Sequence, residues 1–241
     1  MMWIALLTSG CVVGGTVFVM TKALAALTEV KIHLLESFHD NEPAGASMFI
    51  LYNAALACLA ALLVTYISPI NTGSGLPETK ALLNGTSIPT FLRLETLVTK
   101  ILAITLVVAA GFPVGKEGPM VHIGAAVCSG VLNAHLFNRK RGEISSAVEN
   151  TTSGFNRKST FATIGGAAGI AAAFNAPIGG ILYVFEELST FWSPETTFKA
   201  FAVCGFAALS AQVLLHVASE GASAHLESHI IFNVVDHTTT R

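Results

Sequence analysis

Apolar residues in this chain occur in long runs without charged side chains, and polar segments separate the runs. Six charge-free runs cover 3–21, 43–77, 101–115, 118–138, 159–185 and 200–219. Most approach the roughly 20 residues that a helix needs to cross the hydrocarbon layer of a membrane. The pattern predicts an all-α polytopic membrane protein with helices at 3–25, 48–67, 77–83, 94–110, 117–137, 161–174, 177–188 and 198–217.

The segments between these runs are predicted as loops. Residues 22–42 mix both signs of charge, and 138–158 is the most basic segment of the chain. Because cytoplasmic loops of membrane proteins are enriched in Lys and Arg, we expect 138–158 on the cytoplasmic side. Residues 218–241 are polar and are expected to form a tail on the opposite side. The Gly14-Gly15 pair is expected to be a weak point of the first helix.

Composition supports a membrane protein and does not suggest a metal or cofactor. The 241 residues are 52% hydrophobic and 12% charged, against about 25% charged in soluble domains. The formal net charge of −2 is uninformative about partners, since the charges lie in loops, and no nucleic-acid partner is expected. The four cysteines lie in apolar runs without the spacing of a metal site, so we expect unpaired structural thiols.

Helix breakers occur where the sequence still lacks charge. Residues 68–77 read SPINTGSGLP. Irregular backbone at membrane depth usually lines a cavity, because its polar groups cannot face lipid. A short helix after this segment, capped by Ser74 or Gly75, would direct its positive end toward that cavity.

A single acidic residue, Glu117, lies between two apolar runs, within the sequence GKEGP. A carboxylate buried at that depth is a functional-site hypothesis by default. The flanking Gly115 and Gly118 allow backbone N–H groups to approach a ligand, and Pro119 is tolerated in a first helical turn. The pattern predicts a helix N-terminus that attracts an anion, with Lys116 beside it.

Three segments together resemble the signature sequences of the CLC family of chloride channels and chloride/proton exchangers. They are GSGLPE at 73–78, GKEGP at 115–119, and GIAAAFNAP at 169–177 followed by Glu186-Glu187. The resemblance covers about 3–217 and corresponds to the first half of the family's inverted-repeat fold. It implies a partial transmembrane domain at 1–217 and a tail at 218–241 that leads toward a second half. Without that half, the chain would hold only part of a pore.

The resemblance also implies roles for single residues. Glu117 would be the gate, whose carboxylate occupies an anion site and leaves it when protonated, so that proton and chloride binding are linked. Ser74, Gly75, Gly115, Lys116 and Gly118 would contribute to anion binding, since N–H and O–H donors hold a dehydrated anion without trapping it. The serine at position 74 favours chloride.

Glu187 corresponds to an inward-facing glutamate that passes protons in the family's exchangers, and it favours chloride/proton exchange. The partners so implied are chloride, protons, the lipid bilayer and a second subunit, in a homodimer through 177–188 and 198–217. The Phe191-Trp192 pair favours endomembranes over the plasma membrane.

Two other functions stay open. The chain could belong to a passive voltage-gated chloride channel, or it could be a non-conducting truncated subunit that binds a full-length partner. A phosphate-loop enzyme is not expected, because the glycine spacing before Lys116 is one residue short and Glu117 replaces the magnesium-binding hydroxyl.

The candidate residues also have plain structural interpretations. Glu117 could pair with Lys116 at a membrane boundary, and Ser74 could be only a helix cap. Glu187 could be an interfacial carboxylate at a helix end. His122, one turn beyond Glu117, is expected to be packed and hydrogen-bonded and to take no part in proton transfer.

Overall fold

The computed structural model describes residues 2–38, 42–86, 88, 90–139, 152–189 and 192–220. These residues form eight α-helices, one 3-10 turn and one π-helical turn, with no strand among them, so the all-α prediction is confirmed. In chain order the elements are α1 (Met2–Glu36), α2 (Glu42–Ile67), η1 (Pro69–Asn71), α3 (Leu76–Leu83), α4 (Leu94–Ala109), α5 (Glu117–Arg139), α6 (Thr152–Phe174), α7 (Pro177–Tyr183), the π turn η2 (Val184–Leu188) and α8 (Pro194–Glu220).

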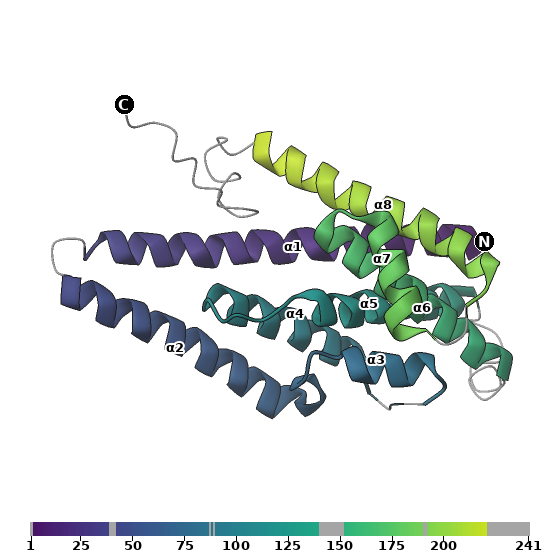
Figure 1. The fold of residues 1–241 in the computed structure, drawn as a ribbon, viewed down its shortest axis with the longest axis horizontal. Helices are drawn as coiled ribbons and strands as arrows, with labels where there is room; N and C mark the ends of the chain where they lie inside the picture. Colours follow the sequence, from purple (N-terminus) through teal and green to yellow (C-terminus); the bar gives the residue numbers. More distant parts are fainter. Residues whose placement is uncertain are drawn as a thin grey trace.

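Helix α1 is longer than the hydrophobic pattern predicts. It continues through most of 22–42, so the loop expected there is wrong. Two contacts hold the added turns: Lys31 Nζ donates a hydrogen bond to Ala109 O at 2.9 Å, and the Tyr52 hydroxyl donates to Leu27 O at 2.9 Å. Helices α1 and α2 lie side by side in this region (Figure 1). Leu24 and Leu27 pack there against the cluster of Leu56, Ala109 and Ala110, so charges elsewhere on the helix do not end it.

Helices α1 and α8 pack closely, as Figure 1 shows for the upper part of the molecule. A Cβ atom on Gly14 would lie 3.0 Å from the backbone nitrogen of Ala211 and would overlap the Ser210 hydroxyl. The expected weak point at Gly14-Gly15 is therefore wrong, because α1 is continuous there. Gly14 instead allows the two backbones to approach.

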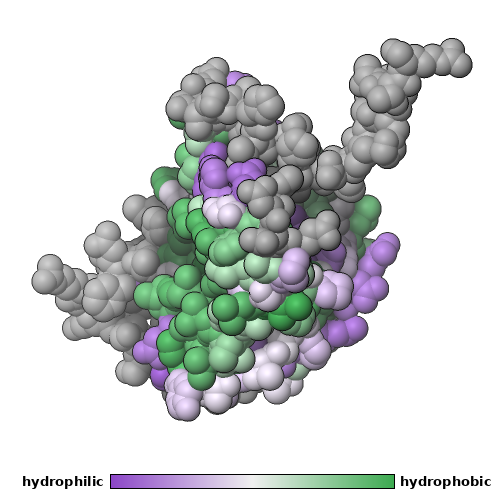
Figure 2. Space-filling view, turned by 90° about the vertical axis from the view of Figure 1, so that its left-hand side faces the viewer, coloured by the Kyte–Doolittle hydropathy of each residue, from purple (hydrophilic) through white to green (hydrophobic). Residues whose placement is uncertain are grey.

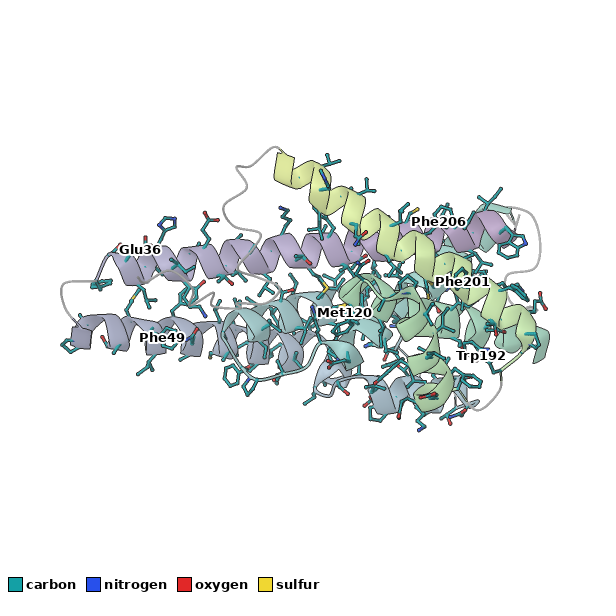
Figure 3. All side chains as sticks on the ribbon, turned by 45° about the horizontal axis from the view of Figure 1, so that its top comes forward. Glu36, Phe49, Met120, Trp192, Phe201 and Phe206 are labelled. Atoms are coloured by element: carbon teal, nitrogen blue, oxygen red, sulfur yellow. The ribbon has the colours of Figure 1, made fainter. Side chains whose placement is uncertain are left out.

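Helices α5 and α6 form the centre of the molecule. A Cβ atom on Gly124 would lie 2.9 Å from the carbonyl carbon of Gly165 and 3.0 Å from Gly169 Cα. Gly165 and Gly169 therefore allow the backbones of α5 and α6 to pack closely. Met120, on the first turns of α5, is buried among the packed helices (Figure 3).

Among the described residues, three helices are long and apolar enough to cross a membrane: Trp3–Glu36, Pro43–Ile67 and Pro194–Ala218. Figure 2 shows one face of the molecule with a broad hydrophobic area and hydrophilic residues mainly at its margins. Large apolar side chains such as Ile50 and Phe198 are exposed, as expected when lipid is the solvent. Part of the predicted basic loop is helical, since α6 begins at Thr152, and residues 140–151 lie outside the described residues.

Candidate functional site

The N-termini of α3 and α5 meet in the folded chain. Gly118, in the first turn of α5, faces the segment just before α3: a Cβ atom on Gly118 would lie 2.8 Å from Ser74 Cβ and 3.1 Å from Leu76 Cδ1. Glycine is required here because any side chain would push the helices apart. Sequence positions 74 and 117 are far apart in the chain, and this contact brings them into one site.

Gly75 is the cap residue of α3. Its φ of 87° lies in the left-handed region, which favours glycine, and a Cβ there would lie 3.0 Å from His122 Cβ. The sequence left Ser74 and Gly75 open as caps, and the backbone geometry selects Gly75. Ser74 lies one residue earlier and is exposed.

The Ser74 hydroxyl oxygen accepts a hydrogen bond from the Leu76 N–H at 3.3 Å. This contact occupies a lone pair of the oxygen and leaves the hydroxyl hydrogen available for another acceptor. Ser74 therefore shares in capping α3 and can still act as a donor.

Glu117 is the first residue of α5, and its side chain is exposed. The expectation of a buried carboxylate is wrong. The carboxylate instead folds back over Gly115, where a Cβ atom would overlap Glu117 Oε2. The reason is local: 111–117 is exposed throughout, because this segment leaves the buried core before α5 begins. Gly115 leaves room for the carboxylate.

Lys116 does not pair with Glu117 in the structure. Its Nζ lies 5.0 Å from the centre of the Phe174 ring, a cation–π distance. Phe174 is the last residue of α6. Within the described ranges, no ion pair involves Glu117. The simple pairing of the two neighbours is thus not the arrangement observed.

Lys100 is a component of the site that the sequence analysis assigned to no role. It is 3% exposed, and its Nζ donates hydrogen bonds to the backbone oxygens of Gly73 and Asn71. It also lies close enough to Glu78 for a Coulombic attraction. The available signal was the single lysine of the mostly apolar helix 94–110. Its buried charge lies beside the peptide that precedes Ser74.

A cavity of ≈ 620 Å³ adjoins these residues. Its wall is mostly apolar and comes from α2, η1, α4 and the segment before α5. Ser74, Lys100 and Gly115 are among its lining residues. An apolar cavity with a few converging polar groups is the usual form of a small-ligand site.

Glu187 lies in the π turn η2, and it is exposed together with Glu186. The Ser189 N–H donates to Val184 O at 3.0 Å, which is the i to i+5 bond of a π turn. The helix expected at 177–188 therefore divides at Tyr183. Single π turns change the direction of side chains and are frequent at functional sites. The Tyr183 phenol lies within Coulombic range of both Glu187 and Glu117.

His122 is packed, as expected. It is 1% exposed, its ring stacks on Phe91 at 3.9 Å, and Nε2 lies 2.9 Å from Phe91 O. It holds α5 against the segment before α4.

Within the described ranges, no group of three or more potential metal ligands occurs. Cys11, Cys58, Cys128 and Cys204 are free thiols.

An all-α fold whose broken helices direct two N-termini to one place defines the class of polytopic membrane proteins with discontinuous helices. Residues 56–236 match the family model described as voltage gated chloride channel, and the chain belongs to this family. The resemblance seen in the signature segments is therefore confirmed.

Several curated proteins are similar to this chain. Chloride channel protein D of Dictyostelium discoideum is 37% identical over 234 residues, which make up 96% of this chain and 22% of that protein. The H(+)/Cl(-) exchange transporter 7 of Bos taurus is 34% identical over 206 residues, which make up 83% of this chain and 25% of that protein. The chain thus spans about a quarter of the length of these relatives.

Two solved structures share the fold. A eukaryotic CLC transporter matches with a TM-score of 0.70 at 27% identity, over 87% of this chain and 38% of that chain. A slow cyanobacterial Cl-/H+ antiporter matches with a TM-score of 0.70 at 21% identity, over 90% of this chain and 46% of that chain. The second likeness concerns the fold alone.

Proposed function

We propose that this chain contributes one wall of a chloride pathway and that the pathway exchanges chloride for protons. The contact between Ser74 and Gly118 is the observation that carries the proposal. It brings the positive ends of α3 and α5 to one place, as an anion site requires. Membership in the voltage gated chloride channel family supports the same reading.

The donors at this place suit an anion that must be released quickly. The Ser74 hydroxyl and the first N–H groups of α5 attract chloride without a full positive charge in contact with it. Gly75, Gly115 and Gly118 keep side chains away from these N–H groups. The Lys100 ammonium is bound to backbone oxygens, so it raises the local potential without capturing the ion.

Glu117 is suited to act as the gate. Its carboxylate is exposed at the N-terminus of α5, where chloride would also bind. It is joined to no ion pair in the part of the chain that the structure describes, so no such bond must break for it to move. Two anions at one helix end exclude each other, and a proton on Glu117 removes that competition.

Glu187 is proposed as the second proton-carrying group. The π turn presents it from the end of α7, and Tyr183 lies within Coulombic range of both Glu187 and Glu117. In this proposal the proton passes between the two carboxylates along α7. The proposal favours exchange over passive flux, and relatives that are named H(+)/Cl(-) exchange transporters agree with it.

The test compares matched glutamine variants of neighbouring carboxylates. In proteoliposomes of the complete gene product, chloride and proton fluxes are measured together under a pH gradient. We expect Glu187→Gln to reduce proton flux roughly a hundredfold, the scale of losing a positioned proton-transfer group. Chloride flux should continue. Glu186→Gln should leave both fluxes unchanged, because Glu186 shares the π turn but has no role in the proposed route.

Glu117→Gln should abolish proton coupling while chloride still passes, because the variant mimics a permanently protonated gate. If chloride flux in the unaltered protein produces no proton movement, the exchanger is rejected and the passive channel is adopted. If the protein carries no chloride and only binds a full-length subunit, the non-conducting alternative replaces both.

A homodimer is proposed through 177–188 and 198–217. This surface is formed by α7, η2 and α8. The residues that they contribute are apolar and exposed: Ile178, Leu182, Phe185, Phe201, Leu209 and Val213. Figure 3 shows Phe201 and Phe206 on α8. Such a surface needs either lipid or a second subunit as its neighbour. Single cysteines introduced at positions 201 and 209 should cross-link two subunits if the surface is a dimer interface, and should not cross-link if it faces lipid.

A further inference from the structure

The cation of Lys116 is held by an aromatic ring on another helix. Its Nζ lies 5.0 Å from the Phe174 ring centre, within the distance of about 6 Å at which a cation–π attraction operates. Lys116 immediately precedes Glu117, so its flexible side chain could otherwise turn to the carboxylate. The observed arrangement keeps opposite charges on adjacent residues apart.

The position of the Phe174 ring is fixed by the backbone around it. Helix α6 ends at Phe174, and Asn175 then adopts a φ of 52° in the left-handed region. The Ala176 N–H returns to Ala171 O at 3.1 Å and closes the helix end. Phe174 is 42% exposed, so its side chain is accessible to the lysine.

The two partners are also aligned by the packing of their helices. The Met120 N–H donates to Lys116 O at 3.0 Å, which fixes Lys116 at the start of α5. A Cβ atom on Gly169 would lie 3.0 Å from the Met120 carbonyl carbon, so the end of α6 rests on the first turns of α5. The negative end of the α6 dipole adds a favourable field for the ammonium.

We propose that Phe174 is a positioning residue that holds the Lys116 ammonium away from Glu117 and so keeps the carboxylate free to move. This inference rests on the proposed gating role of Glu117. Without the aromatic face, the ammonium would turn to Glu117 and form an ion pair. The paired carboxylate would leave its place more slowly, and chloride turnover would fall.

The test uses four proteins derived from the complete gene product: Phe174→Leu, Phe174→Tyr, Lys116→Gln and the double variant Phe174→Leu with Lys116→Gln. Chloride turnover is measured in proteoliposomes. Phe174→Leu removes the aromatic face, and we expect turnover to fall roughly two- to fivefold, the range of an exposed cation–π contact. Phe174→Tyr keeps the face and should retain turnover.

The Lys116→Gln background separates positioning from a structural role. There Phe174→Leu should have no further effect, because no ammonium remains to pair with Glu117. Equal loss in both backgrounds, or equal turnover of Phe174→Leu and Phe174→Tyr, overturns the inference. Failure of the proposed function has a different signature: the unaltered protein would carry no chloride flux that responds to Glu117→Gln, and that result would overturn both.

Discussion

The Ser74 side chain lies directly against Gly118, the residue that follows Glu117. A Cβ atom on Gly118 would be 2.8 Å from Ser74 Cβ and 3.2 Å from Ser74 Oγ. Side-chain contacts so short are not tolerated, so the two helix ends can meet only if position 118 is glycine. The separation of two candidate anion-binding elements is therefore set by the absence of one side chain.

Replacement of Gly118 by alanine should separate the two helix ends. We expect destabilisation by about 1–3 kcal/mol, the usual cost of overpacking, and a weaker chloride affinity because the donors no longer converge. Thermal unfolding of the purified protein and chloride titration measure the two effects. Gly130→Ala is the matched control on the same helix, since nothing lies within 4 Å of its added Cβ. Equal behaviour of the two variants would contradict the contact.

Lys100→Met should weaken chloride binding. The variant keeps a long side chain but removes the ammonium that binds the backbone oxygens of Gly73 and Asn71. A unit charge near a partly buried site is worth on the order of 1–2 kcal/mol, so chloride affinity should fall about tenfold. Isothermal titration or the concentration dependence of flux measures this change.

The control for Lys100 is Lys199→Met. Lys199 pairs with Glu195, one turn away on α8. An ion pair of this kind contributes little to stability. Because Lys199 does not line the cavity beside Ser74, we expect no change in chloride affinity. A loss of similar size in both variants would show that net charge, and not the position of Lys100, governs the site.

The adjacent glycines of α1 should respond differently to the same substitution. Gly14→Ala places a Cβ against Ser210 and Ala207 of α8, whereas an added Cβ on Gly15 meets nothing within 4 Å. We expect Gly14→Ala to lower stability by about 1–3 kcal/mol. Gly15→Ala should be neutral or stabilising by up to about 1 kcal/mol, because alanine favours the helix. The thermal unfolding midpoints of the two variants measure this difference. An equal loss of stability in Gly15→Ala would rule out the packing explanation.

Hydrophobic runs predicted the helices well in their centres and less well at their ends. The pattern located α4 and α5 to within a few residues. It ended α1 too early, because charged residues between 22 and 36 look like a loop when their neighbours are unknown. In the fold, Lys31 binds the end of α4 and Tyr52 binds the backbone of α1, so the polar segment stays helical.

The sequence indicated Ser74 and Glu117 as candidate residues, but it indicated neither Lys100 nor how these residues are arranged. The glycines around Glu117 and the breakers before Leu76 indicate two helix N-termini from local sequence alone. The exposure of Glu117 has no local signal, and the single lysine in 94–110 does not by itself show that Lys100 is buried, because both depend on which elements pack beside these residues.

The sequence by itself determined the class of protein, the order of its helices, the family and the types of residue at the candidate site. These follow from composition, helix breakers and short motifs, which act within a few residues. Only the tertiary structure decided that Ser74 meets Gly118, that Lys116 lies over Phe174, and that Glu187 leaves its helix in a π turn. The first two contacts join distant segments, and they form because glycines at the helix interfaces let the backbones pack closely. The π turn is a local i to i+5 hydrogen bond.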